Sequence, residues 1–262
     1  MSFLIDSHCH FDDVQFDADR ELALQRAHAV GVKAQVLPAV TAALWPKLKE
    51  ICEFYPNLFP AYGLHPIYLA QHDMQNNIKQ LADYLTQNKA VAIGECGLDF
   101  YLKELDEKQQ ITLFLEQLYL AQQYQLPVII HARRATDKVL YYLRKITGIR
   151  GVLHSFIGSE QQAWQLIDLG YYFSVGGPVT YPRAQRLRAL IKILPLERLL
   201  VETDAPDQPL CGRQGQRNEP AYLPDIVAMI AQLRQQSFAE IATASTKNAI
   251  DLFRLPLSHE SI

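Results

Sequence analysis

Residues 91–131 read VAIGECGLDFYLKELDEKQQITLFLEQLYLAQQYQLPVIIH. Two short apolar runs, Val91–Ile93 and Val128–Ile130, enclose a segment over about 107–124 in which apolar residues recur at spacings of three and four. This pattern predicts a strand, a helix and a second strand. Because the connection contains a helix, the two strands are expected to be parallel and to belong to one sheet.

The same alternation continues outward in both directions along the chain. Strand-like runs are expected at Phe3–Ile5, Val32–Leu37, Phe59–Leu64, Val91–Ile93, Val128–Ile130, Val152–Leu153, Tyr171–Val175 and Leu199–Val201. Helices are expected at about 17–30, 42–55, 74–87, 107–124, 136–146, 159–168, 183–193 and 222–235, followed by 238–243 and 246–253. Eight units in 262 residues correspond to roughly 33 residues per unit, a usual length for a βα repeat. Both a closed barrel and an open doubly wound sheet fit this alternation.

The composition indicates an ordinary globular protein, with 49% hydrophobic and 20% charged residues. No linker-like stretch divides the chain, so a single domain over residues 1–262 is expected. The net charge of −3 excludes a general polycation that coats nucleic acid. Any binding of phosphate must therefore come from a local patch or from metal ions.

Features of targeting and redox chemistry point to the cytoplasm. The chain begins MSFLIDSH, without the basic segment and apolar core of a signal peptide. No apolar run reaches the length of about 18 residues that a membrane-spanning helix needs. The four cysteines form no C-x-x-C pair, which fits a reducing compartment.

The first candidate metal ligands are His8 and His10, an H-x-H pair after the first strand. Residues i and i+2 of a strand point to the same face, so both imidazoles can reach one ion. Taken alone, such a pair is more often hydrogen-bonded structure than a pair of ligands.

Four further residues lie just after other predicted strands. These residues are Glu95, His131, His154 and Asp204. In a barrel the C-terminal ends of all strands converge on one mouth, where the active sites of this fold lie, whereas an open sheet spreads them along an edge. The candidate ligands therefore favour an α/β fold with a single (β/α)8 TIM barrel and an active site at the C-terminal ends of the strands.

These six residues predict a centre with two divalent metal ions. Four imidazoles and two carboxylates in one mouth are unfavourable without a cation. Their nitrogen and oxygen donors suit Zn, Mn, Fe or Co, and carboxylates with water also admit Mg. Six ligands are too many for one catalytic zinc with an open position and suit two ions that share a bridging group. Glu95, central in the strand order, is the natural bridge.

Other polar residues near strand ends are candidates for substrate chemistry. His65, which follows the third strand, either binds phosphate or protonates the leaving oxygen, or is a hydrogen-bonded loop residue. Arg133 can clamp a phosphate with two hydrogen bonds, and Asp204 can accept the proton of an attacking water. Glu202 either orients a ligand histidine or is a buried structural acid.

A series of motifs in fixed order covers essentially the whole chain and resembles a known family. The motifs are Ile5-Asp6-Ser7-His8-Cys9-His10, Gly63-Leu64-His65-Pro66, Gly94-Glu95-Cys96-Gly97-Leu98-Asp99-Phe100, Ile130-His131-Ala132-Arg133, Leu153-His154-Ser155-Phe156, Val201-Glu202-Thr203-Asp204-Ala205-Pro206 and Arg217-Asn218-Glu219-Pro220. They resemble the TatD-type hydrolases, metal-dependent deoxyribonucleases of the amidohydrolase-like barrel superfamily. Ala132 departs from the family pattern, in which many members have cysteine or serine, and this affects no ligand.

The resemblance implies a role for each matching residue. It implies one metal bound by His8, His10, Glu95 and Asp204, and a second bound by Glu95, His131 and His154. It implies that His65 lies near the substrate phosphate and that Asn218 and Glu219 belong to the substrate-binding region. The activity that it implies is 3′–5′ exonuclease-like cleavage of DNA.

We therefore expect a metal-dependent hydrolase that cleaves phosphodiesters of DNA, at single-stranded or frayed ends, through a metal-activated water. Nothing in the sequence indicates an obligate protein partner. The first alternative is a small-molecule hydrolase acting on an amide, lactone or phosphoester, because the same metals can activate water against a carbonyl. The second is a metal-binding scaffold without turnover. A site for a polyanion requires Arg133, Arg217 and His65 to point into the mouth.

Overall fold

A computed structural model describes residues 3–257. It contains one eight-stranded sheet in which the strands follow one another in chain order. The strands are β1 Leu4–Asp6, β2 Val32–Pro38, β3 Leu58–Tyr62, β4 Ala92–Asp99, β5 Val128–Arg133, β6 Gly151–Leu153, β7 Tyr172–Val175 and β8 Leu199–Val201. The helices are α1 Arg20–Ala29, α2 Trp45–Phe54, α3 Met74–Gln87, α4 Glu107–Tyr124, α5 Thr136–Leu143, α6 Glu160–Asp168, α7 Gln185–Ile193, α8 Leu223–Arg234 and α9 Phe238–Phe253.

The residues divide into two compact units. Of the described residues, unit 1 comprises residues 3–37, Ser155–Glu160 and residues 172–257, and unit 2 comprises Pro38–His154 and Gln161–Tyr171. The first and last strands meet inside unit 1, where the N–H of Ser7 donates to the carbonyl of Val201 at 3.0 Å. This contact joins the two ends of the strand order, as a closed barrel requires.

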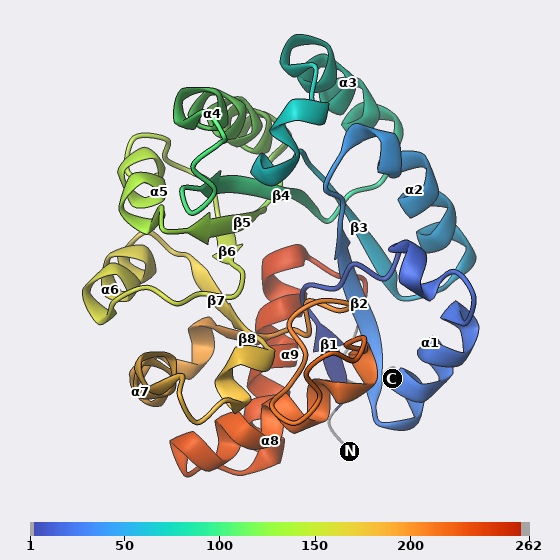
Figure 1. Ribbon diagram of the computed structural model, residues 1–262, viewed down its shortest axis with the longest axis vertical. Helices are drawn as coiled ribbons and strands as arrows, with labels where there is room; N and C mark the ends of the chain where they lie inside the picture. The colour runs from blue at the N-terminus through green and yellow to red at the C-terminus, as the bar shows by residue number, and fades with distance from the viewer. Residues whose placement is uncertain (1–2, 258–262) are drawn as a thin grey trace. The chain divides into compact units, whose positions relative to one another are not determined.

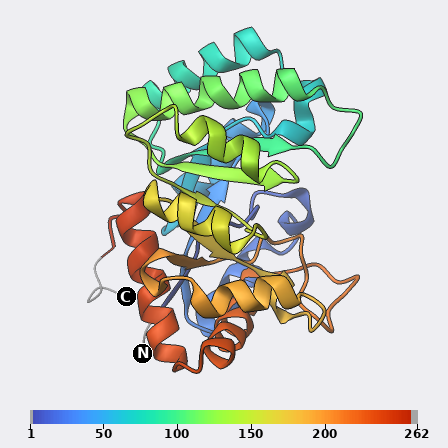
Figure 2. The ribbon, with the colours of Figure 1, turned by 90° about the vertical axis from the view of Figure 1, so that its left-hand side faces the viewer.

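Unit 2 contains β3 to β6, with α3 and α4 side by side on its outside (Figures 1 and 2). Helix α4 begins where the side chain of Asp106 accepts the N–H of Gln109, and it ends at Gln125, whose φ of 54° is left-handed. Its buried face includes Leu113, Phe114 and Leu118, which pack toward the strands. The apolar residues that recur at spacings of three and four in the sequence are therefore the residues that α4 buries against the strands.

Strands β4 and β5 extend beyond the ends that the sequence predicts. The pairing continues through Gly97 opposite His131 and Asp99 opposite Arg133. As a result Glu95 and His131 lie inside strands and not after them. Glycines and charged residues interrupt the apolar run in the sequence, but every residue of β4 is buried and the backbone pairing does not depend on side-chain polarity.

Gly97 makes the close approach of these two strands possible. Its φ of +142° is a backbone conformation that residues other than glycine rarely adopt. A Cβ atom built on this residue would lie 2.0 Å from the carbonyl oxygen of His131. Only glycine therefore fits opposite His131.

In unit 1, α8 and α9 pack against each other (Figure 1). The prediction of two helical segments at the end of the chain is wrong, because α9 is one helix from Phe238 to Phe253. Ser245 lies at the predicted break, but its hydroxyl donates to the carbonyl of Ala242 one turn earlier, at 3.2 Å. The helix thus accommodates the serine without interruption.

None of the helices among residues 3–257 has both the length and the apolar character needed to cross a bilayer.

Candidate metal centre

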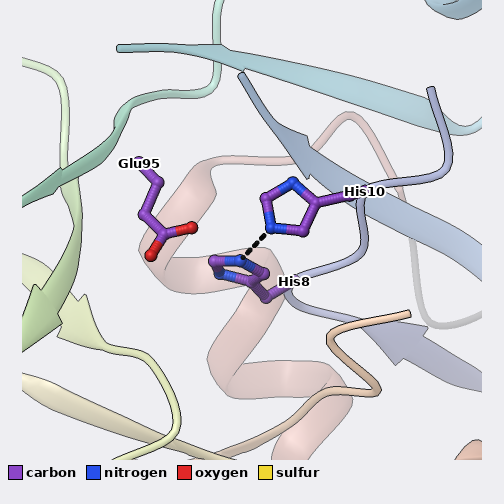
Figure 3. A group of neighbouring side chains, drawn as sticks. All are labelled: His8, His10 and Glu95. Carbon is purple, nitrogen blue, oxygen red and sulfur yellow. Dashed lines mark hydrogen bonds between the residues drawn. The ribbon is translucent and has the colours of Figure 1, made fainter. Parts of the chain in front are cut away.

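Unit 1 holds a cluster of three ligand-type side chains, His8, His10 and Asp204, which we call the His8 cluster. His8 and His10 follow β1, and Asp204 follows β8. The Nε2 atoms of the two histidines are 3.2 Å apart, and their rings meet edge to face (Figure 3). Asp204 Oδ1 lies 3.3 Å from Nε2 of His8 and 3.5 Å from Nε2 of His10. The three donor atoms therefore face one another.

Hydrogen bonds between the ends of β1 and β8 hold this cluster in place. The buried carboxylate of Asp6 accepts the N–H of Thr203 at 2.9 Å and the hydroxyl of Thr203 at 2.5 Å. The N–H of Asp204 donates to the carbonyl of His8 at 2.9 Å. Burial raises the pKa of Asp6 to about 7, although the hydrogen bonds from Thr203 work in the opposite direction. Sequence reasoning assigned no role to Asp6 or Thr203.

A second group orients Asp204 from the other side. Gln208 Nε2 donates to Asp204 Oδ2 at 2.5 Å, and Gln208 Oε1 accepts the hydroxyl of Ser155 at 2.9 Å. The backbone of Asp204 has a φ of 57°, in the left-handed region. These bonds direct Oδ1 toward the two histidines and use Oδ2 for anchoring. The sequence offered no signal for Gln208, because a loop glutamine has no pattern that marks its partner.

Unit 2 holds a second cluster, His65, Glu95, His131 and His154, which we call the Glu95 cluster. Three imidazole nitrogens lie around one carboxylate oxygen of β4. Glu95 Oε1 is 2.8 Å from His65 Nε2, 3.1 Å from His131 Nδ1 and 2.9 Å from His154 Nε2. The last two nitrogens are 3.2 Å apart. The Glu95 carboxylate, drawn in Figure 3, is almost completely buried.

The donor set of each cluster fits a divalent cation. Nitrogen and oxygen ligands bind Zn²⁺ at about 2.0–2.2 Å, so two ligands of one ion lie about 3–3.5 Å from each other. The separations in the His8 cluster and those among Glu95, His131 and His154 fall in or close to this range. Imidazole and carboxylate are also the ligand types of Mn²⁺ and Fe²⁺.

Asp99, at the end of β4, orients His131. Its Oδ2 accepts the Nε2–H of His131 at 2.9 Å, and its Oδ1 accepts the N–H of Tyr101. Burial opposes the charge of Asp99, but the hydrogen bond of His131 and the backbone N–H groups together hold its pKa below the ordinary value. Burial likewise opposes a charged His131, yet its bonds to Asp99 and Glu95 raise its pKa. The carboxylates of Asp99 and Glu95 thus favour the protonated, positively charged form of His131.

His65 takes part in the Glu95 cluster as a hydrogen-bond donor. Its Nδ1 accepts the N–H of Ile67 at 3.1 Å, so in the neutral ring the proton is on Nε2 and is donated to Glu95. Burial lowers the pKa of His65 to about 4, while the neighbouring Glu95 acts in the opposite direction. In this structure His65 is a neutral ring that steadies Glu95, and its predicted contact with phosphate stays a prediction.

The predicted substrate-binding residues Arg133 and Asn218 differ in exposure and in the groups that they contact. Arg133 is half-exposed, and its guanidinium stacks on the ring of Tyr101 at 3.8 Å. The buried amide of Asn218 donates to backbone carbonyls, including those of Thr203 and Asp207, at 2.8 Å. The side chain of Arg133, which also lies 4.0 Å from Asp99, is therefore partly accessible, whereas the amide of Asn218 is buried.

Glu219 and Arg217 belong to an ion-pair network with α1. Arg217 contacts Asp19 at 2.7 Å and Glu219 at 2.8 Å, and Arg26 contacts the same two carboxylates at 2.9 and 2.8 Å. The network ties the loop after β8 to α1, as Asn218 ties it to β8. The roles of Asn218 and Glu219 in substrate binding therefore stay predictions.

Glu202 accepts the backbone N–H of Ser155 at 2.7 Å. Ser155 directly follows His154 in the chain, so Glu202 anchors the segment that carries this candidate ligand. Its predicted role of orienting the imidazole of a ligand histidine stays a prediction.

Comparisons with known proteins agree with this description. The family model described as TatD related DNase matches residues 5–254. The uncharacterized metal-dependent hydrolase YjjV of Escherichia coli K12 is 44% identical over 255 residues, which cover 96% of this chain and 98% of that protein.

Solved structures share the fold. The crystal structure of YjjV, described as a TatD homolog from E. coli K12, has a TM-score of 0.93 at 42% identity and covers 97% of this chain and 98% of its own. A mutant organophosphorus hydrolase from Deinococcus radiodurans has a TM-score of 0.69 at 14% identity, covering 97% and 93%, and is similar in fold alone. The predicted (β/α)8 barrel is confirmed.

Proposed function

Since the chain belongs to the TatD-related DNase family and is a metal-dependent hydrolase, we propose that it cleaves phosphodiester bonds of DNA, at single-stranded or frayed ends. The observation that carries the proposal is the convergence of His131 and His154 on Glu95 Oε1, at 2.9–3.1 Å. Such a group of donors matches the chemistry of a hydrolytic metal centre.

We propose two divalent ions, Zn²⁺, Mn²⁺ or Mg²⁺, one for each cluster. His8, His10 and Asp204 would hold the first, and Glu95, His131 and His154 the second. Bound ions supply Lewis acidity and lower the pKa of a bound water toward 7. That Glu95 also serves the first ion stays a prediction from the sequence.

The protein's own residues would orient the reactants and move one proton. Asp204 is the proposed proton acceptor, because its carboxylate lies beside the two histidines and Gln208 fixes its orientation. Arg133 is the proposed phosphate contact, since its side chain is half-exposed and its guanidinium stacks on the ring of Tyr101. His65 would keep the Glu95 carboxylate in place.

One observation favours a second candidate, a small-molecule hydrolase acting on an amide, lactone or phosphoester. Of the three residues expected to meet a polyanion, Arg217 is paired with Asp19 and Glu219, and His65 donates to Glu95. Arg133 lies 4.0 Å from Asp99 but keeps about half of its side chain exposed, and a single arginine suits one phosphate or carboxylate group better than a long nucleic acid.

The test uses single-stranded DNA labelled separately at its 5′ and 3′ ends. Metal-stripped protein is incubated with each substrate after addition of Mg²⁺, Mn²⁺ or Zn²⁺. Shortening from the 3′ end, absent without metal, supports the nuclease and its polarity. The Asp204→Asn variant, prepared in parallel, must lose the products, because products that persist come from a contaminant. Intact DNA with metal bound overturns the nuclease, and turnover of a panel of lactones, amides and small phosphoesters then supports the alternative.

A further inference from the structure

Helix α4 carries two completely buried glutamines, Gln110 and Gln117. They are seven residues apart, which is close to two helical turns, so both side chains lie on the same face of the helix. A buried amide is unfavourable unless its donors and acceptor are bonded. The hydrogen-bond partners of these two amides therefore show which backbone segments α4 fixes in place.

Gln117 binds both backbone groups of Leu64. Its Oε1 accepts the N–H of Leu64 at 2.8 Å, and its Nε2 donates to the carbonyl of Leu64 at 3.0 Å. The second hydrogen of Nε2 is directed to the carbonyl of Leu113 at 3.2 Å. Strand β3 ends at Tyr62, so Leu64 lies beyond the last strand residue, and the glutamine replaces the partner that a neighbouring strand would supply.

Gln110 repeats the arrangement at the end of the next strand. Its Oε1 accepts the N–H of Asp99 at 2.8 Å, and its Nε2 donates to the carbonyl of Asp99 at 3.0 Å. Asp99 is the last residue of β4. Each glutamine thus binds the N–H and the carbonyl of one residue at a strand end.

Both bound residues are linked directly to a histidine of the Glu95 cluster. Leu64 precedes His65, whose Nε2 contacts Glu95 Oε1 at 2.8 Å. The side chain of Asp99 accepts the Nε2–H of His131, whose Nδ1 lies 3.1 Å from the same oxygen. A shift of either backbone segment would turn one of the two rings.

We propose that Gln117 and Gln110 are positioning residues for the Glu95 cluster, Gln117 acting through Leu64 on His65 and Gln110 acting through Asp99 on His131. Glutamine suits this task because its amide offers one donor and one acceptor to a peptide group. Methionine has a similar length but offers neither strong donor nor strong acceptor. The proposal deepens the proposed function, and only its activity readout rests on that function.

The primary test is ring-nitrogen NMR of metal-free protein labelled with 15N-histidine. The signals of His65 and His131 report which ring nitrogen carries the proton and how strongly it is hydrogen bonded. We expect Gln117→Met to shift the His65 nitrogens by several ppm with little change at His131. Gln110→Met is expected to shift the His131 nitrogens with little change at His65. A general loss of stability would not shift one histidine in one variant and the other histidine in the other variant.

Gln122→Met is the control on the same helix. Gln122 is exposed and donates to the carbonyl of Thr147 at 2.7 Å, a bond to backbone at a position outside the cluster. It should leave both histidines unchanged. The proposal is overturned if Gln110→Met and Gln117→Met leave their histidines unchanged, or if each variant shifts both rings alike. If a methionine variant fails to fold, the Gln→Glu variant of that position, which keeps the size and an acceptor oxygen, is judged by the same spectra.

A second readout separates this proposal from the proposed function. If the wild-type protein cleaves DNA, we expect kcat to fall at least tenfold in both methionine variants, with KM changed less than threefold. Unchanged kcat in both variants counts against the positioning role. If the wild-type protein cleaves no DNA, the proposed function fails, while the NMR result still decides whether the glutamines position the two rings.

Discussion

The two nitrogens of His131 have different partners: Nε2 lies 2.9 Å from Asp99 Oδ2, and Nδ1 lies 3.1 Å from Glu95 Oε1. The bond to Asp99 fixes the orientation of the ring and leaves Nδ1 for a ligand. Histidines that bind metals in proteins commonly have a carboxylate in this position. The bond between Asp99 and His131 therefore indicates that Nδ1 of His131 would bind the ion.

We expect Asp99→Asn to weaken metal binding by roughly 10–100-fold, because the ring loses the charge that orients it and makes Nδ1 a better ligand. Titration of metal-free protein with Zn²⁺ or Mn²⁺ in a calorimeter measures the change. Asp106→Asn is the control, since Asp106 caps the N-terminus of α4 and asparagine caps equally well. Equal affinities of Asp99→Asn and the wild type would contradict the assignment.

Each cluster is expected to account for one ion. The variants His10→Ala and His131→Ala each remove a ligand from a different cluster, so each should lower the stoichiometry from two ions to one per chain. Elemental analysis of protein saturated with metal and then dialysed gives the count. Loss of both ions in both variants would argue for a single shared centre, and retention of two ions would exclude these histidines as ligands.

The network of Arg26, Arg217, Asp19 and Glu219 should make stability depend on pH at the acidic end. The hydrogen bonds of Arg217 and Arg26 hold the pKa of Asp19 below its ordinary value. Burial works against the charge of Glu219, but the same two arginines lower its pKa as well. A carboxylate with a lowered pKa stabilises the folded state above its unfolded pKa, about 4, and this contribution is lost as the pH falls through the folded pKa.

Arg217→Met should consequently cost about 1 kcal/mol between pH 5 and 7, with a smaller difference from the wild type below about pH 4. Urea unfolding at a series of pH values measures this difference. Arg213→Met serves as the comparison in the same loop. The guanidinium of Arg213 stacks on the ring of Tyr222 at 3.8 Å and lies 4.0 Å from the carboxylate of Asp225, so its removal should show a smaller dependence on pH. A cost of Arg217→Met that grows as the pH falls would contradict the sign.

Gly97→Ala should destabilise the fold by about 3 kcal/mol or more. The φ of this position is unfavourable for alanine, and the added Cβ would clash with the carbonyl oxygen of His131. Gly148→Ala isolates the first effect, because Gly148 has a φ of +82° and open space around it. We expect it to cost about 1 kcal/mol. Thermal unfolding of both variants provides the comparison, and similar melting temperatures would show that the space opposite His131 is not limiting.

The strand–helix alternation and the candidate ligands could be recognised in the sequence because both depend on short-range patterns. Apolar runs and helical period arise within a few residues, and parallel strands carry whatever follows them to the same end of the sheet. His8, His10 and Asp204 lie together in the structure, as do Glu95, His131 and His154. Their positions next to the predicted strands were sufficient to select them as candidates, and their role as metal ligands stays a prediction.

The length of β4 and the continuity of α9 could not be predicted in this way. Gly94, Glu95 and Gly97 break the apolar pattern of β4, although pairing with β5 continues to Asp99. Ser245 similarly breaks the pattern of α9 but bonds inside the helix. In both elements the backbone hydrogen bonds continue where the side-chain pattern stops.

The residue types of the candidate site, and the strands with which they are associated, were predicted from the sequence alone. Only the tertiary structure decided their partners: Gln117 for Leu64, Gln208 for Asp204, Asp99 for His131, and Asp19 for Arg217. The physical reason is that hydrophobic periodicity is a local property, whereas a hydrogen bond needs two groups within about 3 Å and in line. For residues such as Asp19 and Arg217, which are far apart in the chain, folding alone brings the two groups to that distance.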